Sequence, residues 1–365
     1  MSISALILFF IILLVLVIIH EFGHFIVAKL VGMRVDEFAF GFPPRLFKKK
    51  VGETTYALNA LPLGGYVSIW GENGEPDDEA KHHPRAFGNR PWWAQLLVLI
   101  AGVAMNMVLA LFIFIAISYG EVTVSVDDPV YGGRVQNPQI MVVDVATESP
   151  AYRVGIAPGA TIISVFAGKT MAPLTTATSL IDFIGSHQND PLTITYKHVD
   201  GTVSSTTIAS VYGIVPDKKA IGVSVESAGT IQIGIIDAFV LGYQRTVSMT
   251  TMTLDGLTAL VTSIGKGDNV LESLSGPIGI AKIVGQTSEY GAKAVLTLVA
   301  VLSINLAIFN ILPLPALDGG RMVIVVIETV VRRKIPYKFY SIANVIGFLS
   351  LMLLLVVVTA HDIWK

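Results

Sequence analysis

Four long apolar runs dominate this sequence of 365 residues and constrain its fold more than any other feature. An α-helix needs about 20 mostly apolar residues to cross the roughly 30 Å hydrocarbon core of a bilayer. Only 14% of the chain is charged, against about a quarter in ordinary soluble proteins. We therefore predict a polytopic α-helical membrane protein with about four transmembrane helices. The expected spans cover residues 4–31, 92–119, 292–312 and 339–360.

The lysine and arginine residues predict the orientation of these spans. Eight lie between the first and second runs, and five lie between the third and fourth. Loops rich in basic residues usually stay on the cytoplasmic side. We therefore expect the long segment between the second and third runs, and both termini, to be extracytoplasmic.

The segments between the spans differ in pattern, and they divide the chain into four regions. An N-terminal membrane part covers 1–120 and includes an apolar loop, about 53–72, that reads as a β-hairpin dipping into the membrane body. Residues 121–227 alternate short β-type runs with turns around one helix-like run. Residues 228–291 read as amphipathic helices near the membrane surface, and 292–365 form a C-terminal membrane part.

Composition excludes several classes of function. The chain has no cysteine, so it has no disulfide framework, cysteine nucleophile or thiolate metal site. Its net charge is −2, and no basic run is interleaved with aromatic residues. We therefore expect the lipid bilayer as a partner and no nucleic acid.

Two histidines and a glutamate lie inside the first apolar run, in the stretch HEFGH. His20 and His24 are four residues apart, so a helix places both imidazoles on one face, where they can bind one metal ion. Glu21 lies close enough to deprotonate a water molecule there, and the whole is the zinc-hydrolase pattern H-E-x-x-H. Polar packing inside the span, or an ion path, is the alternative interpretation.

A catalytic zinc site usually has three protein ligands, so a third should come from elsewhere in the chain. Asp318 stands out, because it follows the third run within the stretch NILPLPALDGG. The two prolines of that stretch prevent a regular helix, and its two glycines let the backbone pass close to another element. Alone, Asp318 would be read as a helix N-cap; with the two histidines it becomes the expected third ligand.

Together these motifs resemble the site-2 protease family of intramembrane zinc metalloproteases, and within it the bacterial regulators of sigma-E. HEFGH in a first span matches one family motif, and N-x-x-P-x-P-x-L-D-G-G after a later span matches the other. The stretches SGPIGIAKIVGQTSEYG and SPAYRVGIAPGATIISVFAG resemble the family's segment before its third span and the start of a PDZ domain. Many relatives carry two tandem PDZ modules, whereas the β-rich segment here has room for one.

The resemblance implies one Zn²⁺ bound by His20, His24 and Asp318, with Glu21 as the general base. It also implies that substrate contacts lie at Asn310 and in the apolar hairpin. There an unwound substrate would pair as an added strand. The hairpin residues concerned are Gly64, Gly65 and Tyr66.

A PDZ-like domain is the implied identity of residues 121–227. The stretch KAIGVSV could supply its carboxylate-binding loop, with Ile221 and Gly222 at the centre, or it could be an ordinary strand. The domain would either bind a C-terminus or extended strand, or act as a size filter for substrates already trimmed outside the membrane.

These expectations describe a metalloendopeptidase of the bacterial inner membrane that acts in regulated intramembrane proteolysis. The implied substrates are single-span membrane proteins, such as an anti-sigma factor or a remnant signal peptide, pre-trimmed by another protease. Two other classes remain open at this point. One is a catalytically silent PDZ-bearing membrane scaffold; the other is a transporter, which should show inverted repeats or paired broken helices.

Overall fold

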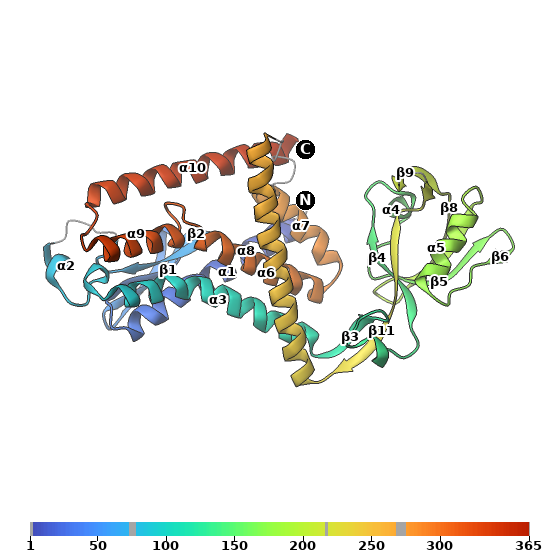
Figure 1. Ribbon diagram of the computed structural model, residues 1–365, viewed down its shortest axis with the longest axis horizontal. Helices are drawn as coiled ribbons and strands as arrows, with labels where there is room; N and C mark the ends of the chain where they lie inside the picture. The colour runs from blue at the N-terminus through green and yellow to red at the C-terminus, as the bar shows by residue number, and fades with distance from the viewer. Residues whose placement is uncertain (1–2, 73–77, 216–217, 268–274, 365) are drawn as a thin grey trace. The chain divides into compact units, whose positions relative to one another are not determined.

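The computed structural model describes residues 3–72, 78–215, 218–267 and 275–364 (Figure 1). The chain divides into two compact units. The first joins Met1–Ala116 to Phe239–Lys365, and the second is Ile117–Ala238.

Four helices are long and apolar enough to cross a membrane, and they lie close to the four expected spans. Their outward faces carry apolar side chains; on the first helix Ile7, Ile11 and Val15 are exposed at four-residue spacing. Such a stripe is what lipid contact requires, since lipid tails replace water there. The four helices are α1 (Ile3–Leu30), α3 (Trp92–Ser118), α8 (Ala292–Ile311) and α10 (Tyr337–Trp364).

Helix α1 lies at the centre of the first unit and packs through two apolar clusters. At one end, Ile12 and Leu16 pack against α7 (Pro277–Glu289) and α8. At the other end, Ala28 packs with Val98 of α3 and with the helix α9 (Asp318–Val331). Helix α1 is therefore fixed against each of the elements that build the site described below. The remaining short helices of this unit are α2 (Asp78–His82) and η1 (Phe87–Asn89).

Strands β1 (Val35–Val51) and β2 (Thr54–Ile69) form a sheet against α1 with a double register. Phe38 pairs with both Tyr56 and Val67, so the first part of β1 lies between the two halves of β2. The sequence prediction was wrong here. It placed a hairpin at about 53–72, but the partner of both halves is β1, which the sequence did not reveal. This arrangement leaves the last part of β2 at the edge of the sheet.

The second unit is a β-sheet with one helix packed on it. Its strands follow the order β3-β11-β4-β5-β7-β8, with β6 paired to β5. Helix α5 (Ala177–Ser186) begins at a capping box made by Thr176 and Ser179, and buries Leu180 and Phe183 in the core. The strands are β3 (Gly120–Ser125), β4 (Gln139–Val145), β5 (Thr161–Ala167), β6 (Thr170–Met171), β7 (Leu192–Lys197), β8 (Val203–Ile208) and β11 (Val223–Ile233). A separate pair, β9 (Val211–Val215) and β10 (Lys218–Ala220), and the short helices η2 (Gly132–Arg134) and α4 (Pro150–Arg153) complete the unit.

Strand β11 corrects the expected end of the β-rich segment at 227. It continues to Ile233, because its alternation persists, with Ile231 and Ile233 buried while it pairs with β3. The segment expected to be helical from 228 therefore begins as a strand. Helix α6 (Ile235–Lys266) follows, and Thr253 on it donates a hydrogen bond to Asn305 of α8 over 2.9 Å.

Candidate metal centre

Helix α1 presents both motif histidines on one face, as the four-residue spacing requires. His20 and His24 are 6% and 7% exposed, and their rings meet edge to face with centroids 4.8 Å apart. Their Nε2 atoms lie 3.2 Å from each other. Two imidazoles thus direct the same ring nitrogen to one buried point.

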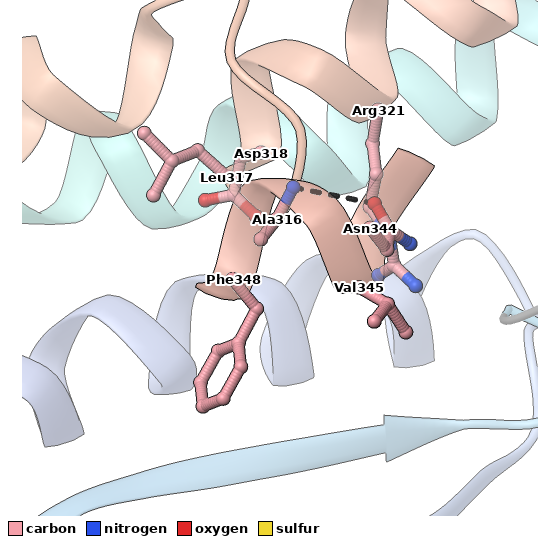
Figure 2. Close-up of a pocket in the computed structure, with 7 residues that line it drawn as sticks. All are labelled: Ala316, Leu317, Asp318, Arg321, Asn344, Val345 and Phe348. Carbon is pink, nitrogen blue, oxygen red and sulfur yellow. Dashed lines mark hydrogen bonds between the residues drawn. The ribbon is translucent and has the colours of Figure 1, made fainter. Parts of the chain in front are cut away.

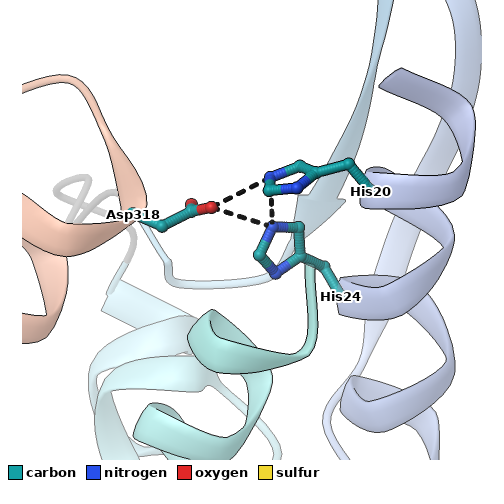
Figure 3. Close-up of side chains that lie close together, drawn as sticks. All are labelled: His20, His24 and Asp318. Atoms are coloured by element: carbon teal, nitrogen blue, oxygen red, sulfur yellow. Dashed lines mark hydrogen bonds and ion pairs between the residues drawn. The ribbon is translucent and has the colours of Figure 1, made fainter. Parts of the chain in front are cut away.

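The loop between α8 and α9 brings a carboxylate to that point (Figure 3). Asp318 is the first residue of α9, and its Oδ2 lies 2.9 Å from His20 Nε2 and 3.3 Å from His24 Nε2. The loop folds back so tightly that a Cβ on Gly319 would strike the carbonyls of Ile311 and Leu312. Only glycine fits there, and this compact turn places Asp318 against α1.

The donor set fits a zinc ion. Two imidazole nitrogens and one carboxylate oxygen lie within 4.8 Å of one another. Among the described residues, this is the one group of three or more His, Asp or Glu side chains so placed. Zinc accepts such nitrogen and oxygen donors, and three protein ligands leave its fourth position open for substrate or water.

Glu21 is held by the edge of the sheet. Its Oε2 accepts a hydrogen bond from the backbone N–H of Val67 in β2, over 3.0 Å. A Cβ on Gly65 would lie 3.9 Å from the Glu21 side chain and only 2.8 Å from the carbonyl oxygen of Ala39. The edge strand therefore passes directly beside the carboxylate that follows the first histidine in the sequence.

Asn310 also reaches the centre, from the last turn of α8. Its Nδ2 lies 3.3 Å from His20 Nε2. In the sheet, Gly64 has a φ of 150° and packs on Phe42, while the Tyr66 hydroxyl donates to Glu37 over 3.0 Å. Of the four residues expected to contact substrate here, Asn310 and Gly65 are therefore nearest the centre, and the Tyr66 hydroxyl is already bonded within the sheet.

Ile221 and Gly222 lie in the second unit, between β10 and β11. The Ile221 side chain is buried in the core, and its carbonyl accepts the N–H of Ala151 over 3.0 Å. Gly222 has a φ of 85°, and its carbonyl accepts the N–H of Ala146 over 2.9 Å. The loop thus holds the segment that contains α4, and its carboxylate-binding role stays a prediction.

Helix α3 contributes three groups to the centre that the sequence analysis did not single out. The carbonyl of Val98 accepts a hydrogen bond from His24 Nδ1 over 2.8 Å. Gly102 faces both rings, and Asn106 lies 3.3 Å from His20 Nδ1. For Asn106 the sequence does contain a signal. An asparagine inside an apolar run costs free energy to bury unless its amide has a hydrogen-bond partner.

Gly102 gives a sharp test of this packing. A Cβ there would overlap His24 Nε2 and lie 2.8 Å from Cε1 of His20. We expect Gly102→Ala to lower zinc affinity at least about tenfold, because the methyl group would displace the imidazole rings of the two candidate ligands. Metal titration against a chelating dye measures this effect. Gly256→Ala on α6, where nothing lies within 4 Å, should leave zinc binding unchanged. Wild-type affinity in Gly102→Ala would contradict the described geometry.

A pocket of about 370 Å³ opens beside Asp318, between the start of α9 and α10 (Figure 2). The Ala316 N–H donates to Asn344 of α10 over 3.2 Å, and Val345 and Phe348 line the same pocket. Arg321, on its wall, forms an ion pair with Glu72, just after β2. Burial alone would lower the pKa of Arg321, but the charge of Glu72 and the contact with Tyr340 raise it above its ordinary value.

Known proteins resemble this chain over nearly its whole length. The model of Peptidase family M50 matches residues 8–354. A protein of Clostridium perfringens, by name a candidate zinc metalloprotease, is 34% identical over 95% of this chain and 95% of its own. A similarly named protein of Clostridium acetobutylicum is 31% identical over 96% and 94%. Zinc metalloprotease RasP of Geobacillus kaustophilus is 28% identical over 100% and 99%.

The family match contains both sequence motifs and includes all or most of each candidate span. The transporter interpretation is therefore set aside. The chain belongs to peptidase family M50, the site-2 family of membrane zinc metalloproteases.

Proposed function

We propose that the protein is an intramembrane endopeptidase that hydrolyses peptide bonds within or near the transmembrane segments of single-span membrane proteins. His20, His24 and Asp318 hold one zinc ion, and Glu21 is the general base. The observation that carries the proposal is the convergence of the three candidate ligands within a group of candidate membrane spans. Glu21, next to His20 in the sequence, is hydrogen-bonded to the edge of the sheet.

The chemistry is divided between the metal and the protein. When bound, zinc acts as a Lewis acid that polarises a carbonyl and makes water a better nucleophile at neutral pH. Glu21 takes the proton of the attacking water and passes it to the leaving amine. The Val67 N–H orients the Glu21 carboxylate for both transfers. The Asn310 amide lies close enough to the centre to hold the substrate backbone.

A transmembrane substrate must unwind before it is cut, because its peptide bonds are hidden in helical hydrogen bonds. The edge formed by residues 65–69 of β2 can hold the unwound segment as an added strand. Gly65 and Tyr66 begin this edge, directly after Gly64, and Gly65 lies next to Glu21. The pocket beside Asp318 offers room for a substrate side chain near the scissile bond.

The second unit is the proposed PDZ-like domain, with Ile221 and Gly222 in its carboxylate-binding loop. We place it, and both termini, on the outer side of a bacterial inner membrane. The basic loops between spans support this orientation. There the domain binds or filters substrates pre-trimmed by another protease. The substrate class is an anti-sigma factor or a remnant signal peptide, cut in regulated intramembrane proteolysis.

Reconstitution tests this function. Full-length protein in liposomes, with a single-span substrate, should release fragments cut within the span. A zinc chelator should stop the cleavage, and added zinc should restore it. A soluble peptide of the same sequence serves as the control for unwinding, because such a peptide does not have to unwind before it is cut. Zinc-loaded protein that binds single-span proteins yet leaves all of them intact would instead indicate a scaffold.

A further inference from the structure

The two histidines of the centre use the same ring nitrogen. In both rings Nε2 faces Asp318 Oδ2, at 2.9 Å for His20 and 3.3 Å for His24 (Figure 3). A neutral imidazole carries one N–H and one lone pair. If Nε2 is the ligand atom, Nδ1 must carry the proton in each ring, and that N–H needs an acceptor.

Helix α3 provides the acceptor for one of these rings. His24 Nδ1 lies 2.8 Å from the carbonyl oxygen of Val98, which can only accept a hydrogen bond. This contact fixes the His24 tautomer with its proton on Nδ1. About two turns further along the same helix, the side chain of Asn106 lies 3.3 Å from His20 Nδ1.

The Asn106 amide can face His20 Nδ1 with either its nitrogen or its oxygen. Nδ2 faces His20 Nδ1, while Oδ1 is buried and has no hydrogen-bond partner among the described residues. The oxygen and nitrogen of an amide have nearly the same shape, so their assignment follows from the hydrogen-bond network. With Nδ2 donating, His20 would keep its proton on Nε2 and could not use that atom as a ligand. With the amide turned by 180°, Oδ1 gains a donor and Nε2 becomes free.

We propose that Asn106 is a positioning residue whose Oδ1 accepts the Nδ1–H of His20 and so fixes the tautomer that binds zinc through Nε2. This rests on the proposed zinc role of His20. The asparagine is itself held firmly: it is 0% exposed, and its backbone carbonyl accepts the hydroxyl of Ser303 in α8 over 2.8 Å. Partners of this kind orient a ligating imidazole and raise its basicity.

Zinc affinity of the full chain in detergent, measured by competition with a chelating dye, tests the proposal. Asn106→Leu removes the acceptor and should weaken zinc binding about 10- to 100-fold. Asn106→Asp keeps an acceptor and should bind within a few-fold of wild type, or more tightly. Gln95→Leu is the matched control on α3, because its amide is buried but bonded to the Arg90 carbonyl.

Two results would overturn the proposal. One is wild-type affinity in Asn106→Leu; the other is an Asn106→Asp protein that loses zinc as Asn106→Leu does, which would mean that the amide donates. If a variant does not fold, ¹⁵N-histidine NMR of the zinc-loaded wild type shows which ring nitrogen of His20 carries the proton. A proton on Nε2 would contradict the proposal. His20→Ala separates the two claims: unchanged zinc binding there refutes the proposed metal site itself, whatever Asn106 does.

Discussion

Replacing Glu21 with glutamine is expected to lower peptide-bond cleavage by about two to four orders of magnitude, because an amide cannot take the proton of the attacking water. Zinc should stay bound at one ion per chain, since Glu21 is not among the three converging donors. Glutamine also keeps an oxygen to accept the Val67 N–H, so the edge strand should not move. The combination of intact metal and lost turnover is the signature of a general base.

Single-turnover cleavage of a liposome-embedded single-span substrate, with metal content measured on the same sample, gives both readouts. Glu53→Gln is the matched control. Glu53 pairs with Lys29 and Arg85 rather than with the centre, so cleavage should persist. A Glu21→Gln protein that cleaves at the wild-type rate would remove Glu21 from the mechanism.

Asp318→Asn is expected to lose both zinc and activity. The carboxylate oxygen of Asp318 faces both Nε2 atoms, and a neutral amide offers zinc a far weaker ligand there. Two imidazoles alone should not retain the ion through dialysis against a mild chelator. Metal analysis after dialysis measures this loss without reference to activity.

Asp362→Asn provides the comparison for this second prediction. Asp362 is a buried carboxylate, and it accepts the Gly279 N–H over 2.8 Å at the start of α7. An amide oxygen can do the same, so one zinc per chain should remain. If Asp318→Asn keeps its zinc after dialysis, the third ligand must be sought elsewhere.

Features that depend on local sequence were predictable. The four candidate spans needed only apolar length, and the i, i+4 histidines needed only a helix. Asp318 could be paired with them because it follows a span directly, in a stretch whose prolines break the helix and whose glycines allow close approach to another element. These signals do not depend on how the helices pack, because each one comes from residues that are close together in the sequence.

Features that depend on distant pairing were not predictable. Strand β1 carries three consecutive lysines at 48–50, so its sequence does not have the alternation typical of a strand, and it pairs with both halves of β2. The roles of Gly102 and Asn106 follow from the approach of α3 to α1, which no local pattern encodes. The extension of β11 depended on a partner strand about a hundred residues earlier.

His20 and Asp318 lie 298 positions apart in the sequence, and this separation has a consequence for the synthesis of the protein. During synthesis the two histidines leave the ribosome first, and Asp318 follows only after the long segment between them. Until then, the nascent chain carries two of the three proposed metal ligands and no complete centre. Under the proposed function, the protease would therefore be unable to cut neighbouring membrane segments, its own included, before Asp318 has joined the two histidines.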